Sequence, residues 1–226
     1  MSDLTMLPDE NLNEYDERLK ALFEAGKITA EQFSSGCAEA SGRVYISRDN
    51  PRAQSGHGSD VFRWRNVRWL ILEAICGDGT FIDVGCANGH LIESLDNWMN
   101  DTGVAVEFHG LEISDELYRF ACDRLPSYRP RLYHGNALYW KPAVQFDYVY
   151  TMILPDFPLS MRKSFLDNMW DNYVKPEGRL ILGPWNNPEI EDELARNGYP
   201  VTGYCEKYGT DRPGELRRVV WIDKTI

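Results

Sequence analysis

The chain has 226 residues, of which 43% are hydrophobic, and a formal net charge of −11 at pH 7. This length suits one domain with a modest extension, or at most two small domains. The acidic balance argues against a general nucleic-acid binder, because phosphate contacts need an excess of Lys and Arg. The N-terminus lacks the basic and apolar regions of a signal peptide, and no apolar run approaches the roughly 18 residues that span a bilayer.

The spacing of cysteines and histidines favours reduced thiols and no metal site. The five cysteines are odd in number and contain no Cys-x-x-Cys pair, which argues against a disulfide framework and a cysteine zinc site. The four histidines show no His-Glu-x-x-His or similar ligand spacing. We therefore expect a cytoplasmic protein without membrane contact and without a bound metal.

Residues 1–59 predict a helical N-terminal extension that ends in a loop. Apolar residues recur at three- and four-residue spacing over 12–23, which predicts an amphipathic helix. Thr29 and Gln32 then form a capping-box pattern that predicts the start of a second helix. Residues 43–59 are rich in Gly, Pro, Ser and Asn, so we expect a loop there.

Residues 60–226 predict a doubly wound α/β domain. It should open with an amphipathic helix whose inner face carries Val61, Trp64, Val67, Ile71, Ala74 and Ile75. Short apolar strands are expected at 81–85, 104–113, 131–135, 146–153 and 178–183, with helices between them, which argues for a parallel sheet covered on both faces. The last two candidates, 199–209 and 215–223, are joined by turn residues at 209–214 and should pair as an antiparallel hairpin. The expected sheet is seven-stranded and mostly parallel.

The strongest chemical signal lies at the end of the first predicted strand. Residues 81–90 read Phe-Ile-Asp-Val-Gly-Cys-Ala-Asn-Gly-His, so the chain leaves a strand, turns sharply and starts a helix. Small residues at Gly85, Ala87 and Gly89 let a ligand lie against the backbone, and Asp83 can accept a hydrogen bond or face a cation. The alternative is an ordinary glycine-containing turn between strand and helix.

Polar residues also stand at the ends of three later strands. Glu112 ends the second strand, where a carboxylate can accept hydrogen bonds from two adjacent hydroxyl groups. Asn136 ends the third strand and offers a donor and an acceptor, although Asn in that place also supplies turn geometry. Leu138 could pack against a flat ring, and Thr151 and Met152 follow the fourth strand.

In this order the four segments resemble the motifs of class I S-adenosylmethionine (SAM)-dependent methyltransferases, which have a Rossmann-like domain. Ala87 stands where that family usually has a glycine. Residues 154–157 depart from the Asn-Pro-Pro-Tyr motif of enzymes that methylate base amino groups in DNA and RNA, which argues against that reaction. The resemblance implies that SAM binds at Asp83, Gly85, Cys86, Ala87, Gly89, Glu112, Ile113, Asn136, Ala137, Leu138, Thr151 and Met152.

The methyl acceptor is less determined by the sequence. Residues 50–58 predict a lid loop over the cofactor pocket, and 43–68 carry six Arg against two Asp. We hypothesise that Arg52, Gln54 or His57 touches the acceptor or the cofactor carboxylate, with His57 as a general base. A solvated linker is the alternative. Two further residues are candidates for acceptor binding, namely Trp64, for which a core position is the alternative, and Asp156.

The resemblance implies transfer of a methyl group from SAM to a small-molecule acceptor by O- or N-methylation, leaving S-adenosylhomocysteine. The Arg-rich segment 43–68 and its tryptophan favour an acceptor with an anionic or aromatic portion. An RNA or protein acceptor, or a SAM-binding protein without catalysis, are the alternatives, and a homodimer stays open. An NAD(P)-dependent oxidoreductase would need Gly-x-Gly-x-x-Gly, and His90 stands where its third glycine should be. No Gly-x-Ser-x-Gly elbow of a hydrolase occurs.

Overall fold

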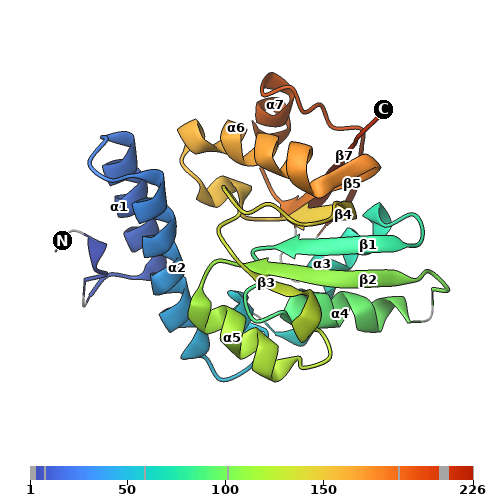
Figure 1. Ribbon diagram of the computed structural model, residues 1–226, viewed down its shortest axis with the longest axis horizontal. Coiled ribbons are helices and arrows are strands. Elements are labelled where there is room, and N and C mark those ends of the chain that lie inside the picture. Colours follow the sequence, from blue (N-terminus) through green and yellow to red (C-terminus); the bar gives the residue numbers. More distant parts are fainter. Residues whose placement is uncertain are drawn as a thin grey trace.

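A seven-stranded sheet with the strand order β3-β2-β1-β4-β5-β7-β6 forms the centre of the protein in the computed structural model (Figure 1). The structure describes residues 4–7, 9–58, 60–100, 102–187, 189–208 and 214–225. Neighbouring strands from β3 to β5 are parallel, whereas β7 runs antiparallel to β5 and β6. The strands are β1 (Gly79–Val84), β2 (Val106–Glu112), β3 (Leu132–His134), β4 (Phe146–Thr151), β5 (Val174–Trp185), β6 (Gly203–Tyr208) and β7 (Leu216–Asp223).

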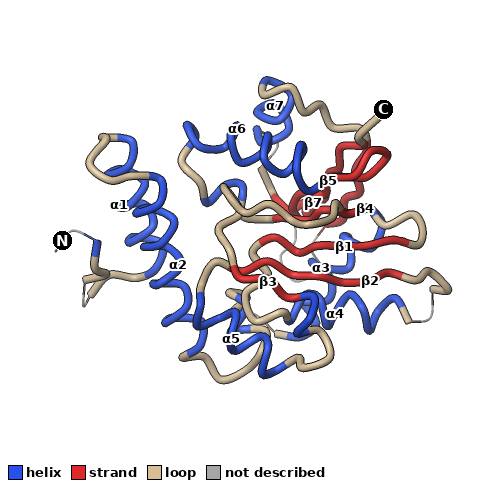
Figure 2. The backbone as a smooth tube through the Cα atoms, viewed as in Figure 1, coloured by secondary structure: helices blue, strands red, loops and turns tan. Residues whose placement is uncertain are grey.

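Helices cover both faces of this sheet (Figures 1 and 2). Helices α3, α4 and α5 lie on one face, together with the short 3-10 segment η3, and α6 and α7 lie on the other. Helices α1 and α2 lie across the end of the sheet to which the parallel strands point. The helices are α1 (Leu12–Glu24), α2 (Ala30–Ile46), α3 (Val61–Arg68), η3 (Trp69–Ala74), α4 (His90–Met99), α5 (Asp115–Arg124), α6 (Leu159–Asn168) and α7 (Glu189–Arg196).

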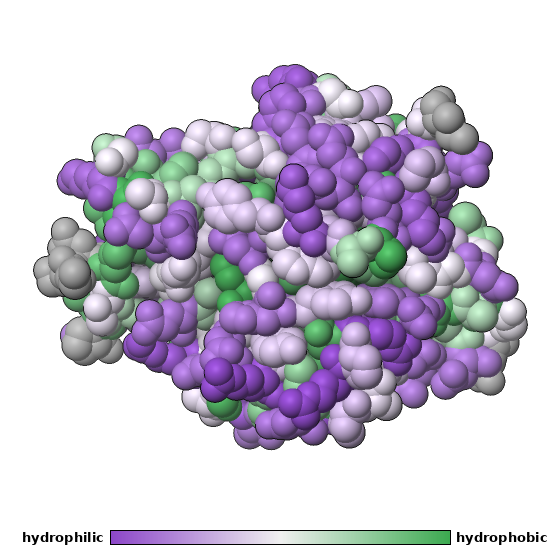
Figure 3. Space-filling model, viewed as in Figure 1, coloured by the Kyte–Doolittle hydropathy of each residue, from purple (hydrophilic) through white to green (hydrophobic). Residues whose placement is uncertain are grey.

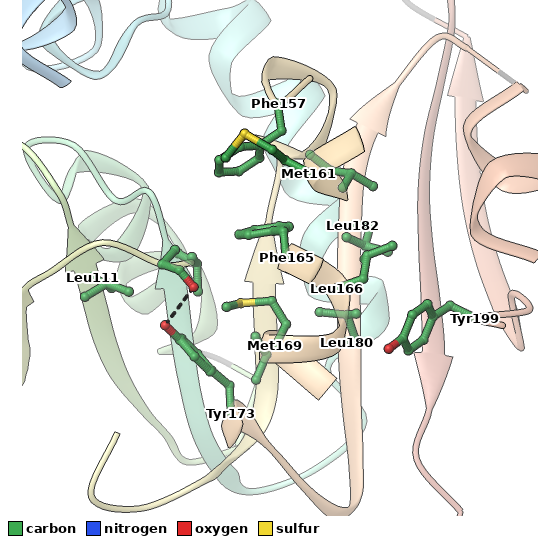
Figure 4. Packing of buried hydrophobic residues seen from close by; sticks show 14 of the residues in the cluster. Leu111, Phe157, Met161, Phe165, Leu166, Met169, Tyr173, Leu180, Leu182 and Tyr199 are labelled. Carbon is green, nitrogen blue, oxygen red and sulfur yellow. Dashed lines mark hydrogen bonds between the residues drawn. The ribbon is translucent and has the colours of Figure 1, made fainter. Parts of the chain in front are cut away.

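Two buried clusters hold the layers together, one on each face of the sheet. Alternation along β4 divides its side chains between them: Val149 packs on the side of α6, and Tyr148 and Tyr150 pack on the side of α4. Figure 4 shows the cluster on the side of α6, which includes Phe165 of α6 and Leu182 of β5. Full burial on both faces explains why the parallel strands are nearly continuous apolar runs.

The N-terminal helices begin where their capping residues predict. Thr29 and Gln32 form the expected capping box at α2, with the Thr29 hydroxyl accepting from the Gln32 amide at 3.1 Å. Tyr15 and Leu19 of α1 are buried in the same cluster as the sheet residues, so the extension and the sheet share a core. On the face seen in Figure 3 the surface is largely hydrophilic, and the apolar residues that reach it gather mainly over α1 and α2.

The fold class expected from the sequence is confirmed, with four local corrections. Helix α2 continues to Ile46 instead of ending before residue 43, because Ser, Gly and Arg are tolerated on its faces. Val61 is 69% exposed rather than on the inner face of α3. Helix α7 was not expected, and the helix predicted to carry Val61 to Ile75 is divided into α3 and η3. Strands β6 and β7 form the predicted antiparallel hairpin, with β6 at the edge of the sheet. The predicted turn at 209–214 lies outside the described residues except for Gly214.

Candidate active site

A cavity of about 310 Å³ lies between the sheet and the N-terminal helices. Its floor is formed by the loops that follow β1, β2, β3 and β4, and its roof by α1, α2 and the segment at 55–56. The volume is within the range of small-ligand pockets. The cavity lies where the connections from β1 and β4 diverge to opposite sides, which is the place where open α/β sheets bind ligands.

The loop between β1 and α4 presents backbone rather than side chains to this cavity. Gly85, Ala87 and Gly89 have φ values of +90°, +48° and +75°. The amides of Gly85 and Cys86 both donate to the Leu111 carbonyl of β2, at 2.8 and 3.0 Å. A side chain at residue 85 would be strained at this φ and would come within 3.1 Å of Ile153. The small residues therefore permit the tight turn that a ligand can approach.

Ala87 has a left-handed backbone, which the side chain of an L-residue disfavours by about 1–2 kcal/mol. We expect Ala87→Gly to raise the free energy of unfolding by about 0.5–1 kcal/mol, since glycine adopts this conformation without a steric cost but loses more entropy on folding. Urea denaturation of both proteins measures the difference. A lower stability for the variant would mean that the Ala87 methyl group contributes more through packing than its backbone strain costs.

Glu112 at the end of β2 is the carboxylate most firmly held at the cavity. It is 6% exposed, and its Oε2 accepts from the Ala87 amide and its Oε1 from the Ser114 amide, both at 2.8 Å. Burial raises the pKa of Glu112, and the backbone amides oppose that rise. Each carboxylate oxygen has a second lone pair. Glu112 can therefore order the loop and still accept hydrogen bonds from a ligand.

Asn136 after β3 both shapes a turn and lines the cavity. Its Oδ1 accepts from the Leu138 amide at 3.0 Å, which gives the turn its geometry, and its side chain lines the cavity. The carbonyl of the next residue, Ala137, accepts two hydrogen bonds. One comes from Asn168 Nδ2 at 2.7 Å, and the other from the Tyr173 hydroxyl at 3.5 Å (Figure 4). Residues of α6 and the following turn thus fix this wall of the cavity.

Asp83 and Arg68 interact electrostatically beside the cavity floor. Asp83 is 3% exposed, and burial raises the pKa of its carboxyl to about 7, although the Arg68 guanidinium acts to lower it. Arg68 comes from α3, is also buried and lines the cavity. Its guanidinium donates to Met152 Sδ at 3.2 Å. Thr151 is fully buried beneath, where its hydroxyl donates to the Val84 carbonyl at 3.1 Å.

The loop at 47–58 approaches the cavity through its backbone. Ser55 and Gly56 line it, and the Asn88 amide group donates to the Pro51 carbonyl at 2.8 Å, which ties this loop to the one after β1. Gln54 turns back instead, and its Nε2 donates to the Arg48 carbonyl at 2.9 Å. The predicted contacts of Arg52 and Gln54 with an acceptor have no support from the cavity lining.

His57 and Trp64 pack together outside the cavity lining. The two rings lie 5.2 Å apart edge to face, and Trp64 stacks on His90 at 4.8 Å. Trp64 is 4% exposed and its indole N–H donates to Ser94 Oγ at 3.0 Å, so it occupies the core position that was its alternative. Burial and the nearby Arg68 lower the pKa of His57 to about 4. His57 would be a weak base, and its assignment as the general base stays a prediction.

The structure thus brings most of the predicted cofactor residues to one cavity. Those that line it are Gly85, Ala87, Glu112, Ile113, Asn136, Ala137 and Met152, together with the acceptor candidate Asp156. Five predicted cofactor residues do not line it: Asp83, Cys86, Gly89, Leu138 and Thr151. The acceptor candidates that do not line it are Arg52, Gln54, His57 and Trp64.

The residues that form the roof of the cavity were not predicted from the sequence. Asp16 of α1 and Ser34, Cys37 and Tyr45 of α2 line it, and so does Arg68. A signal was present, because small and polar residues recur on one side of α2 at helical spacing although the helix is packed there. Without knowing that α2 crosses the strand ends, this pattern did not indicate a site.

No protein-family model matches the sequence, and no curated protein matches it. Solved structures resemble it at low identity. The 1,6-didemethyltoxoflavin-N1-methyltransferase of Burkholderia thailandensis has a TM-score of 0.59 at 12% identity, covering 98% of this chain and 94% of that one. The magnesium protoporphyrin IX methyltransferase of Synechocystis PCC 6803, with bound SAM, has a TM-score of 0.54 at 15% identity, covering 92% and 97%.

The cyclase SpnF has a TM-score of 0.53 at 14% identity, covering 80% of this chain and 85% of that one. The sheet order, the antiparallel β7 and these likenesses define the fold: it is that of the class I SAM-dependent methyltransferases. Because one of these neighbours is a cyclase, this fold alone does not determine the reaction.

Proposed function

We propose that this protein is a SAM-dependent methyltransferase that acts on a small-molecule acceptor. The observation that carries the proposal is the cavity at the carboxyl ends of the parallel strands, where Glu112 and the small-residue loop after β1 meet. Two of the neighbours, the 1,6-didemethyltoxoflavin-N1-methyltransferase and the magnesium protoporphyrin IX methyltransferase, are methyltransferases of small molecules, which supports the same conclusion.

The residues present fit the chemical groups of SAM. Glu112 would accept hydrogen bonds from the two ribose hydroxyl groups, and Asn136 would meet the adenine edge. Arg68, which lines the cavity, would pair with the cofactor carboxylate. Asp83 does not line the cavity, so its contact with the cofactor stays a prediction. The bound cofactor supplies a methyl group that its sulfonium already activates, so this chain mainly holds and aligns the acceptor and excludes water.

The acceptor would occupy the part of the cavity under α1 and α2. A cavity of about 310 Å³ is of the size that takes small ligands rather than a folded nucleic acid or protein domain. Among the described residues no helix has the length and apolar character that crossing a membrane requires. A cytoplasmic location fits the five free cysteines, none of which is paired.

Calorimetry with the purified protein tests this function. We expect saturable binding of SAM and of S-adenosylhomocysteine, and no binding of NAD⁺ or NADH. Binding of NADH alone would overturn the proposal in favour of an oxidoreductase. Binding of SAM without any methylated product, across an acceptor panel followed by mass spectrometry, would favour the catalytically inactive alternative.

Arg68→Met should weaken SAM binding by about 30-fold, since one charge-assisted contact to a carboxylate contributes about 2 kcal/mol. The methionine side chain keeps much of the volume of the arginine stem, so packing against Trp64 is largely retained. Calorimetry measures the change. Arg65→Met, at an exposed position one turn away on α3, is the control and should bind SAM as the wild type does. Equal affinity in both variants would remove Arg68 from the cofactor site.

A further inference from the structure

The acceptor side of the cavity carries two carboxylates from distant parts of the chain. Asp16 comes from α1, and Asp156 from the short 3-10 turn Leu154–Asp156 after β4. Both line the cavity. The Asp16 charge acts on Asp156 and contributes to raising its pKa. The fold therefore brings two like charges to one wall although they are far apart in the sequence.

The surroundings leave this wall negative. Partial loss of hydration raises the pKa of Asp156 to about 6 and also raises that of Asp16. Lys20 and Arg162, which do not line the cavity, act to lower the pKa of Asp156. Each forms an ion pair with another residue, Lys20 with Glu17 at 2.7 Å and Arg162 with Glu193 at 2.7 Å. Neither forms an ion pair with Asp16 or Asp156 in the part of the chain that the structure describes. The wall thus has more carboxylate than cation.

The positive charge of the cavity lies elsewhere. Among the described lining residues Arg68 is the only Lys or Arg, and it contacts Met152 and acts on Asp83. Arg68 does not contribute to the pKa of Asp156. The Cys37 thiol forms a side-chain hydrogen bond with the Asp16 carboxyl group, but the buried Oδ1 atom of Asp16 has no hydrogen-bond partner within the described residues. A buried acceptor of this kind is normally satisfied, so a donor from outside the chain would complete it.

The remaining groups of this wall are aromatic, apolar or neutral. Phe33 of α2 and Phe157 after β4 line it beside the two carboxylates. Burial raises the pKa of the Cys37 thiol and raises that of the Tyr45 phenol to about 12, so both stay uncharged at neutral pH. A ligand that fits here needs a positive, hydrogen-bond-donating group and a flat or apolar skeleton.

We propose that the methyl acceptor is an amine: a compact molecule whose nitrogen lies against Asp16 and Asp156 and whose apolar or aromatic skeleton packs on Phe33 and Phe157. This inference rests on the proposed function and names the acceptor class of the same site. It replaces the anionic portion that the Arg-rich segment 43–68 suggested, because an anion here would face two carboxylates.

The two carboxylates also provide for the proton that N-methylation must displace. The bound ammonium gives one proton to an ionised carboxylate, which becomes a neutral carboxyl group. The freed nitrogen lone pair then forms a bond to the methyl carbon as the carbon–sulfur bond breaks and its electron pair stays on sulfur. The carboxyl group releases the proton to solvent. One ammonium ion is thus converted into one methylated ammonium ion, with one proton released.

Binding of three probes that share one skeleton tests the acceptor class. Phenethylamine, 2-phenylethanol and 3-phenylpropionate are titrated into the protein saturated with S-adenosylhomocysteine, with NMR as the readout. We expect phenethylamine to bind at least about tenfold more tightly than either other probe, as one charge-assisted contact predicts. No binding of phenethylamine, or tighter binding of 3-phenylpropionate, overturns the inference.

The double variant D16N/D156N should lose the preference for the amine and keep its affinity for S-adenosylhomocysteine. Because burial raises the pKa of both Asp16 and Asp156, replacing these carboxyl groups by neutral amides should not destabilise the fold. Asp115→Asn, at an exposed position on α5, is the control and should keep the preference. An unchanged preference in the double variant overturns the inference alone. Failure of the wild type to bind S-adenosylhomocysteine would overturn the proposed function, and the inference with it.

Discussion

Glu112→Gln is expected to weaken SAM binding by about 100-fold, or roughly 3 kcal/mol. In the wild type both carboxylate oxygens accept from backbone amides, at Ala87 and Ser114. An amide side chain has one oxygen, so its NH₂ group would face a donor and leave a buried N–H without an acceptor. The variant would therefore lose a ribose contact and also disturb the loop that lies against the cofactor.

Calorimetry with SAM measures this effect, and urea denaturation separates the affinity change from the loss of stability. Glu116→Gln, only four residues further along the chain, removes an exposed carboxylate of α5 and should bind SAM as the wild type does. If Glu112→Gln bound SAM with unchanged affinity, the ribose assignment would be wrong and Glu112 would serve only to order the loop.

Asp83 should make the protein lose stability as the pH rises. Its folded pKa is raised to about 7 by burial, from an ordinary value of 3.8. At about pH 5 the unfolded chain carries this group ionised while the folded protein carries it protonated, so folding takes up a proton. The resulting stabilisation is lost as the pH rises to about 7. Between about pH 5 and pH 8 this amounts to about 3 kcal/mol.

Asp83→Asn should remove this component of the pH dependence. The measurement is the free energy of unfolding in urea at about pH 5 and about pH 8, for both proteins, because the difference of differences cancels other titrating groups. His57 acts in the opposite direction: its folded pKa is lowered to about 4, so its contribution grows as the pH rises towards 6.5. Asp115→Asn is the control for loss of one carboxylate. Equal pH dependence in wild type and Asp83→Asn would contradict the expectation.

The ends of the parallel strands were the part of the site that the sequence predicted best. Gly85, Glu112 and Asn136 are separated along the chain but each follows a strand of the same parallel sheet. Since the carboxyl ends of such strands meet at one edge, finding the strands was enough to bring these residues together. The helix start at Thr29 could also be predicted from the sequence, because a capping residue acts on amides within its own turn.

The acceptor side depended on packing that no local pattern reveals. Asp16 lies on α1 and Asp156 on the turn after β4. Both line the same cavity only because α1 and α2 fold over the sheet. The sequence offered Trp64 and His57 as candidates for the acceptor site. In the structure Trp64 is a core residue that stacks on His90. An aromatic residue at helical spacing fits either place, and only its neighbours decide between them.

The sequence by itself determined the strands, most of the helices and the residues that end each strand, because apolar periodicity, capping and turn chemistry act over a few residues. It thereby determined the fold class and the cofactor half of the cavity. Only the tertiary structure decided which helix faces cover that cavity, which charges remain on its acceptor wall, and that the loop at 47–58 approaches through Ser55 and Gly56. Those outcomes depend on burial and electrostatic contacts between segments distant along the chain, whose partners are defined only once the chain has folded.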